Sequence, residues 1–144
     1  MPPPQAKTST VSHRVPFYET DAMRIVHHSN FVRYLELARI LWLDEHERPY
    51  RDYMERGLHF ATTHVAVDYR RPAGYDDVLA ITTWLAWVRG ASLRMEYEIV
   101  RDGELLVTAA TEHALVDADG RVQRIPRDQR RALAHLLPDP APGA

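Results

Sequence analysis

The sequence predicts an α+β fold in which a curved antiparallel sheet wraps around one long central helix. Two observations support this fold class. The stretch 30–56 repeats apolar residues at steps of three and four, which is typical of a helix with one buried face. The stretches after Gly57 alternate apolar and polar residues instead, and turn signals such as Asp102-Gly103 separate them. One long helix followed by hairpin-connected strands indicates a sheet with its helices on one side.

The two ends of the chain are expected to lie outside the folded domain. Residues 1–10 and 138–144 are rich in proline and in small or polar residues, so they have little apolar surface to bury. We therefore predict a single domain at 11–137 between disordered N- and C-terminal tails. Its first strand is predicted at 13–18. Pro16 indicates an edge position or a bulge there, because proline cannot donate to a sheet.

The predicted central helix carries a continuous apolar stripe. It follows a plausible N-cap at Ser29 or Asn30. Pro49 is expected to end or kink the helix, with a further turn before Gly57. The stripe makes this helix a core element, and its members are Phe31, Tyr34, Leu35, Ala38, Leu41 and Trp42.

The second half of the chain reads as a series of strands. Asp102-Gly103 is a strong hairpin signal between two of them. A short terminal helix is expected to begin near Ile125-Pro126, since proline suits the first helical turn. The predicted strands lie at 64–70, 78–88, 92–100, 105–116 and, briefly, around Val122.

Composition narrows the function classes. The chain has 144 residues, is 45% hydrophobic and carries a net charge of −2, so no basic field argues for nucleic-acid binding. It has no cysteine, which excludes disulfides, thiolate metal sites and a cysteine nucleophile. No stretch is apolar enough to predict a membrane span or a signal peptide, so we expect a cytoplasmic protein. No metal site is expected, because His27-His28 is adjacent rather than at ligand spacing.

Asp21 is the first candidate for chemistry. It lies just ahead of the start of the predicted helix, seven residues before His28. A helix start presents unpaired N–H groups and partial positive charge, which can polarise a carbonyl oxygen. A carboxylate beside it can act as a nucleophile or as a general base toward water. The simpler interpretation is that Asp21 only stabilises a turn.

An extended motif resembles the signature of hotdog-fold acyl-CoA thioesterases, in particular the 4-hydroxybenzoyl-CoA thioesterase branch. It comprises Tyr18-Glu19-Thr20-Asp21-Ala22-Met23, then 26–31 and 34–39, and the similarity continues through 67–77 and 114–117. The resemblance implies that Asp21 is the catalytic carboxylate and that the backbone N–H of His28 lies where the thioester carbonyl binds. It also implies a homodimer or homotetramer with sites between subunits, an acyl-CoA substrate and no metal or redox cofactor.

The chain departs from the family pattern at Arg24, where glycine is common. Glycine would let this loop adopt unusual dihedral angles. Arg24 therefore makes the loop geometry and the acyl preference open questions.

The remaining candidates are substrate-binding residues. We predict this role for residues near the helix start and for arginines that suit the phosphates of coenzyme A. A structural role or an exposed surface position is the alternative for each of them. Glu36, which resembles the carboxylate of other hotdog branches, is expected to pair with Arg33 or Arg39 instead. The predicted substrate-binding residues are His27, Asn30, Phe31, His64, Arg70 and Arg89, with Arg71 as a further arginine.

The sequence therefore predicts hydrolysis of a short-chain or aromatic acyl-CoA by Asp21. Two alternatives stay open. One is a hotdog-fold hydratase or dehydratase, which would need a His/Asp pair placed for proton transfer. The other is a non-catalytic acyl-CoA binding module, in which Asp21 is only a cap.

Overall fold

The structure is a computed structural model, and it describes residues 2–138 of the chain. One long helix and a five-stranded sheet form its body, which confirms the α+β class. In chain order the elements are β1 (Thr8–Arg14), the short 3₁₀ helix η1 (Phe17–Glu19), α1 (Ser29–His46), α2 (Tyr50–Glu55), β2 (His59–Tyr69), β3 (Val78–Val88), β4 (Ser92–Arg101), β5 (Glu104–Val116) and α3 (Arg127–Ala134).

The five strands form one antiparallel sheet in the order β1-β3-β4-β5-β2. β4 and β5 are joined at Asp102-Gly103, where both residues have positive φ (49° and 79°), as expected for a tight hairpin turn. The short strand expected around Val122 is reduced to a single bridge with Val116.

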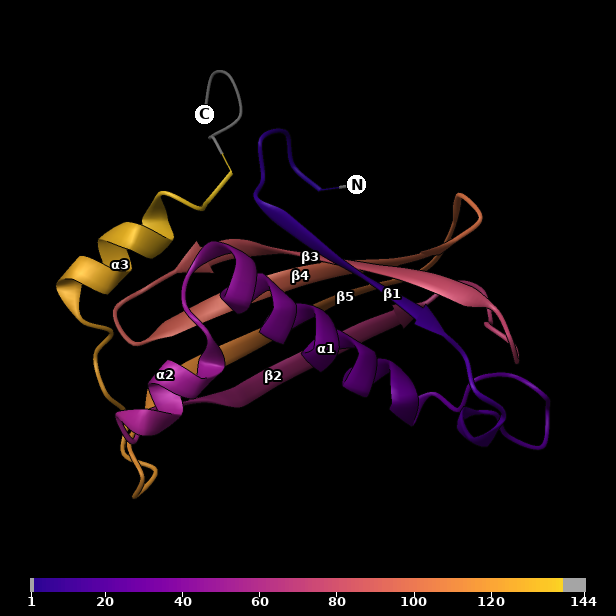
Figure 1. Cartoon of the computed structure of the whole chain (residues 1–144), viewed down its shortest axis with the longest axis horizontal. Helices are drawn as coiled ribbons and strands as arrows, with labels where there is room; N and C mark the ends of the chain where they lie inside the picture. The colour runs from indigo at the N-terminus through magenta and orange to yellow at the C-terminus, as the bar shows by residue number, and fades with distance from the viewer. Residues whose placement is uncertain (1, 139–144) are drawn as a thin grey trace.

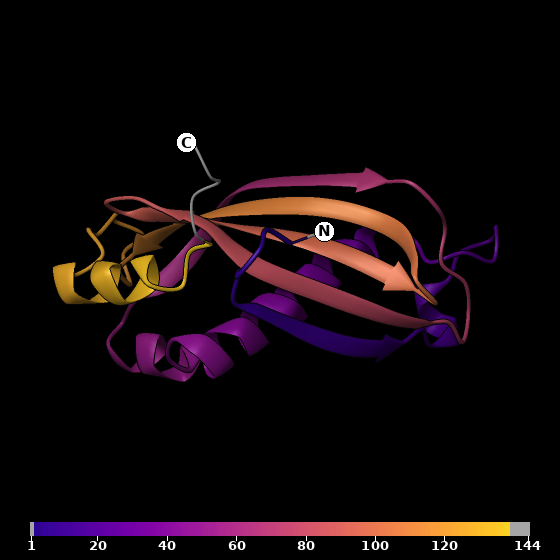
Figure 2. The ribbon, with the colours of Figure 1, turned by 90° about the horizontal axis from the view of Figure 1, so that it is seen from above.

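The sheet curves around α1, which lies across one of its faces (Figures 1 and 2). The helix packs against β1 and β3, and its apolar stripe is buried as predicted except at Leu41. Leu35, Ala38 and Trp42 have no exposed surface. Because side chains three and four positions apart share a helix face, this stripe fills the concave side of the sheet. These features confirm the helix-in-sheet architecture.

The N-terminal boundary predicted from the sequence is wrong. β1 begins at Thr8, inside the expected tail, and ends at Arg14, so only the first two residues of the strand predicted at 13–18 belong to it. β1 pairs with β3 along the whole length of β1, and this pairing holds the polar residues Thr8 and Ser9 in the strand. After β1, Pro16 precedes the single turn of η1. The expected C-terminal tail at 138–144 lies outside the described residues except for Pro138.

The helical stretch divides at Pro49, as predicted. α1 ends at His46, and α2 follows Pro49 and closes before Gly57, which has a positive φ of 69°. The expected N-cap at Ser29 or Asn30 is not observed. His28 takes the N-cap position instead, without a capping side chain of its own.

β2 is an edge strand that pairs only with β5 among the described residues, and most of its side chains are exposed. It begins at His59, five residues before the predicted start. Within residues 2–138, no helix combines the length and the apolar character needed to cross a membrane.

Candidate active site

Asp21 sits at the start of a tight turn between η1 and α1. Thr20 and Val26 form an antiparallel bridge that closes the turn. Inside the bridge, the N–H of Asp21 donates to the carbonyl of Ile25 at 2.9 Å, and the N–H of Arg24 donates to the carbonyl of Asp21 at 2.9 Å. These hydrogen bonds fix the backbone of Asp21 relative to the segment 25–28 that leads into α1.

Arg24 occupies the position where the family resemblance leads us to expect glycine. Its φ is +66°, so the backbone adopts the left-handed conformation that glycine takes without cost. The arginine therefore does not prevent the turn. Its side chain is exposed, so the turn forms without burying a charge.

The Asp21 carboxylate is fixed through one of its two oxygens. Oδ1 accepts a hydrogen bond from the N–H of Met23 at 2.8 Å. Within residues 2–138, no group donates a hydrogen bond to Oδ2. The side chain is partly exposed, so this second oxygen can accept a proton from water or contact a substrate.

The first turn of α1 leaves one donor available. The ring nitrogen Nδ1 of His27 accepts from the N–H of Ser29 at 3.2 Å, and the carbonyl of His27 accepts from the N–H of Asn30 at 2.9 Å. The N–H of Phe31 donates to the carbonyl of His28. In the described part of the chain, the N–H of His28 itself has no partner. It lies at the positive end of the helix dipole, which favours an oxygen acceptor.

Tyr69, at the end of β2, connects the sheet to this helix start. Its hydroxyl donates to the carbonyl of His28 at 3.0 Å, and its ring meets Phe31 edge-on at 5.3 Å. Burial raises the pKa of Tyr69, so the phenol stays protonated and keeps donating. Strand alternation predicted only the face of Tyr69. Its contact with His28 depends on the approach of two distant elements.

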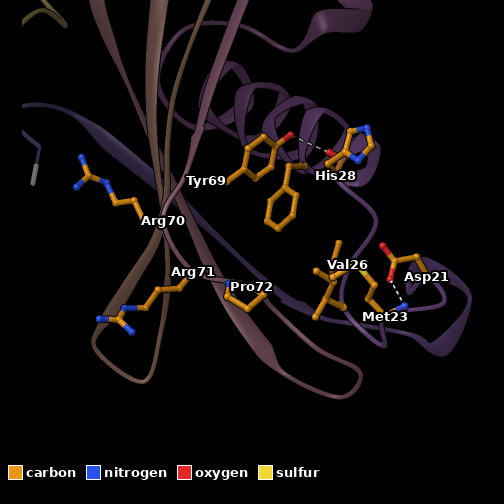
Figure 3. Close-up of a pocket in the computed structure, with 10 residues that line it drawn as sticks. Asp21, Met23, Val26, His28, Tyr69, Arg70, Arg71 and Pro72 are labelled. Atoms are coloured by element: carbon orange, nitrogen blue, oxygen red, sulfur yellow. Dashed lines mark hydrogen bonds between the residues drawn. The ribbon is translucent and has the colours of Figure 1, made fainter.

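Asp21, His28 and Tyr69 line one cavity of about 350 Å³ (Figure 3). Apolar side chains make up much of the rest of its wall, so it suits an apolar group with a polar reactive end. Phe31, one of the predicted substrate-binding residues, also lines it. The other lining residues are Met23, Ile25, Val26, Arg70, Arg71 and Pro72.

The structure does not bring every predicted substrate-binding residue to this cavity. His27 serves the first turn of α1, and its ring stacks on His28 at 4.2 Å. Asn30 is buried, and its amide donates to the carbonyl of Glu19 at 3.0 Å. Both residues therefore have local structural roles that explain their place in the motif.

His64 also lies outside this cavity. It is five residues before Tyr69 on the same strand, and an odd separation places the two side chains on opposite faces of the sheet. Arg70 and Arg71 follow Tyr69 at the cavity rim, but Figure 3 shows their guanidinium groups turned away from Asp21. Arg71 pairs with Glu104 at 3.7 Å.

Arg89 lies far from Asp21. Arg89 directly follows the last residue of β3. The Asp21 turn lies at the other end of this strand, because Ile25 of the turn bridges to Gly74, just before β3 begins. Eleven residues of strand span roughly 35 Å. The Arg89 guanidinium covers the ring of Trp87 at 4.0 Å. Arg89 also lines a separate hollow of about 340 Å³. Three arginines of α3 share this hollow, namely Arg127, Arg130 and Arg131.

Glu36 lies 4.0 Å from Arg39 in an i,i+3 ion pair, as expected. Over residues 2–138, no group of three or more His, Asp or Glu side chains is arranged to hold a metal ion.

Comparisons with known proteins agree with this architecture. Residues 15–133 match the model of the thioesterase-like superfamily. The chain is 29% identical over 126 residues to an acyl-CoA thioesterase of Haemophilus influenzae, named YbgC, covering 85% of this chain and 92% of that protein. It superposes with a TM-score of 0.85 on a hypothetical protein from Thermus thermophilus, at 34% identity and covering 92% and 100% of the two chains. The DHNA-CoA thioesterase of Staphylococcus aureus gives a TM-score of 0.86 at 25% identity, covering 90% of each chain. The expected hotdog fold is confirmed.

Proposed function

The chain belongs to the thioesterase-like superfamily, and on this premise we propose that it hydrolyses short-chain or aromatic acyl-CoA esters, with Asp21 as the catalytic carboxylate. The curated acyl-CoA thioesterase among its relatives supports a coenzyme A ester as the substrate class. One observation carries the proposal for the site. The free oxygen of Asp21 and the unpaired N–H of His28 belong to residues that line the same cavity.

In the proposed reaction, the thioester carbonyl oxygen accepts a hydrogen bond from the N–H of His28. The start of α1 stabilises the negative charge that develops on this oxygen as the carbonyl carbon is attacked. Asp21 acts in one of two ways. It removes a proton from a water molecule that attacks the carbon, or it attacks the carbon itself and forms an anhydride that water then cleaves. In both routes the C–S bond breaks, and the thiolate of coenzyme A leaves and is protonated.

The cavity supports a small acyl group. Met23, Ile25, Val26 and Phe31 supply an apolar wall, and a volume of about 350 Å³ is at the small end of ligand sites. The reaction needs only water, a carboxylate and a backbone N–H. We therefore propose that it proceeds without a metal ion or a redox cofactor.

The edge position of β2 supports a homo-oligomer, either a homodimer or a homotetramer. Its exposed backbone edge can pair with a second copy of the same strand. Arg70 and Arg71, at the cavity rim, are the candidates within one chain for contacting the phosphates of coenzyme A. Arg89 is too far along its own sheet, so it would reach a cavity only across a subunit interface.

The test is the Asp21→Asn variant in an assay that follows thiol release from acetyl-, butyryl- and benzoyl-CoA. The amide preserves the acceptor for the N–H of Met23 but removes the charge, so the fold should survive while kcat falls by about 10³-fold or more. Asp44→Asn is the matched control, because Asp44 is an exposed aspartate near the C-terminal end of α1, outside this cavity and away from β2.

Three outcomes would contradict the proposal. Near-normal turnover by Asp21→Asn would exclude Asp21 as the catalytic group. A wild-type protein that leaves these saturated esters intact but hydrates an enoyl-CoA would be a hydratase. Tight binding of the esters without thiol release would identify a binding module.

A further inference from the structure

Glu19, two residues before Asp21, is a buried carboxylate that the proposed reaction does not use. Its side chain is 5% exposed. Its Oε1 accepts a hydrogen bond from the Tyr34 hydroxyl at 2.6 Å and lies 2.8 Å from Nε2 of His13. A buried carboxylate is costly unless such donors surround it. Burial and the hydrogen bond to Glu19 raise the pKa of Tyr34, which keeps its hydroxyl a donor. Glu19 is thereby fixed to β1 on one side and to α1 on the other.

The backbone of Glu19 fixes the segment that returns from the Asp21 turn. Its carbonyl accepts from the N–H of His27 at 2.9 Å and from the side-chain amide of Asn30 at 3.0 Å. The Thr20–Val26 bridge follows directly, so Glu19 and His27 form the base of the turn that carries Asp21. His28 is the next residue after His27. The contacts of Glu19 therefore join the segment that carries Asp21 to the segment that carries His28.

Catalysis depends on such separations. Misplacement of a catalytic group by about 1 Å can reduce a rate by about 10²-fold, and well-built sites hold their groups within roughly 0.5 Å. The Asp21 turn is partly exposed and is held at two places. On one side Ile25 bridges to Gly74 and the N–H of Val26 donates to the carbonyl of Ala73 at 2.8 Å, and at its base the turn is held by Glu19. Of these contacts, those of Glu19 connect the turn to both β1 and α1.

We propose that Glu19 is the positioning residue of the active site: held by Tyr34 and His13, it sets the distance between Asp21 and the N–H of His28. This inference rests on the proposed role of Asp21. Glu19 touches no reacting atom and acts through the turn, so its loss should lower kcat while leaving KM nearly unchanged.

The experiment compares two buried tyrosines. Tyr34 donates to Glu19 at 2.6 Å, and Tyr53 donates to Glu47 at 2.6 Å beyond the other end of α1. Phenylalanine at either position keeps the ring and deletes the buried hydrogen bond to a glutamate. At Tyr53 it also deletes the hydrogen bond that the Gln129 amide donates to the hydroxyl, so Tyr53→Phe should lose at least as much melting temperature as Tyr34→Phe. Only Tyr34→Phe should lower kcat, by about tenfold, with KM within about threefold of wild type.

Substitutions of Glu19 itself separate positioning from charge. Glu19→Ala should lower kcat more than Tyr34→Phe does. Glu19→Gln, which still offers Tyr34 an oxygen, should retain most of the activity. In a double-mutant cycle, Glu19→Ala should add no further loss to Asp21→Asn, because Glu19 acts only through Asp21.

The inference is overturned if Tyr34→Phe is as active as Tyr53→Phe, or if Glu19→Ala slows Asp21→Asn by the same factor as it slows wild type. These outcomes differ from failure of the proposed function. That failure would appear as a wild-type protein without thiol release, or as an active Asp21→Asn variant. Should Glu19→Ala not fold, the two Tyr→Phe variants and Glu19→Gln still decide the question.

Discussion

The two ends of the helical stretch that contains α1 share one type of buried contact but differ in their surroundings. At the N-terminal end the Tyr34 hydroxyl donates to Glu19, and beyond the C-terminal end the Tyr53 hydroxyl donates to Glu47, each at 2.6 Å. Both tyrosines are 1% exposed. The N-terminal pair lies at the base of the turn that carries Asp21, which lines the cavity of the proposed active site. Similar hydrogen bonds therefore lie next to the proposed active site in one place and close the fold in another.

The polar groups at the two ends show the same contrast. Toward the C-terminal end, the ring N–H of Trp42 donates to the carbonyl of Lys7 at 2.8 Å, and His46 contacts the carbonyl of Thr8. At the N-terminal end, Oδ2 of Asp21 and the N–H of His28 have no partner within residues 2–138. Asp21 and His28 are at least partly exposed, so water solvates these two groups and a substrate can replace that water.

After the loss expected for Asp21→Asn, the largest effect should come from removing the free donor at the N-terminal end. His28 has φ −54°, which proline can adopt, so His28→Pro deletes the N–H with little change in backbone angle at this residue. If this N–H binds the thioester carbonyl, kcat should fall by about 10²–10³-fold. Thiol-release kinetics measure the loss, and circular dichroism checks that the helix still forms.

His28→Ala is the matched control, because it removes the imidazole and keeps the N–H. It should retain far more activity than His28→Pro. The opposite order, with His28→Ala inactive and His28→Pro active, would assign the function to the ring instead of the backbone.

A buried histidine near the C-terminal end of α1 should make the stability of the fold depend on pH. His113, which contacts Thr111 at 2.7 Å behind the C-terminal half of α1, has no exposed surface. Burial, with a smaller contribution from Arg39, lowers the pKa of His113 to about 3. The unfolded chain takes up this proton near pH 6.5 and the folded chain only near pH 3. The free energy of unfolding should therefore decrease by about 2 kcal/mol from this residue as pH falls from 7.5 to 5.

Chemical denaturation at several pH values measures this decrease, and His113→Gln should reduce it. The pH profile of kcat should not change in this variant, since His113 does not line the Asp21 cavity. An unchanged dependence of stability on pH would mean that another group is responsible.

Local patterns predicted most of the fold. The three- and four-residue spacing located α1, Pro49 located its end, and Asp102-Gly103 located the β4–β5 hairpin. The start of β1 was missed because Thr8 and Ser9 are polar and are extended only by pairing with β3, which is about 70 residues away in the sequence.

The parts of the candidate site that come from one local stretch of sequence were also the parts that could be predicted. Asp21, His28 and Phe31 lie close together in the sequence and share one cavity in the structure. Tyr69 was missed because its contact with His28 joins β2 to α1. Glu19 was missed because an acidic residue beside Asp21 resembles surface sequence, and only packing against Tyr34 and His13 shows that it is buried.

The smallest predicted effect concerns backbone strain at the two ends. Arg24 in the N-terminal turn has φ +66°, and Gly57, after α2, has φ +69°. Arg24→Gly should raise the free energy of unfolding by about 0.5–1 kcal/mol, because the relief of strain exceeds the added entropy of the unfolded chain. Gly57→Ala should lower it by about 1 kcal/mol. A Cβ at Gly57 would meet nothing within 4 Å, so this change tests conformation alone.

Urea denaturation of both variants measures the two shifts, and kcat of Arg24→Gly should stay within about threefold of wild type because the turn already has a glycine-like backbone. A destabilised Arg24→Gly would show that the arginine side chain, rather than the hydrogen bonds of Asp21, holds the turn in place. A large loss of kcat without loss of stability would show that glycine frees the turn to move. The strain at Arg24 would then be the cost of keeping Asp21 in position, a cost that the C-terminal end avoids by using glycine.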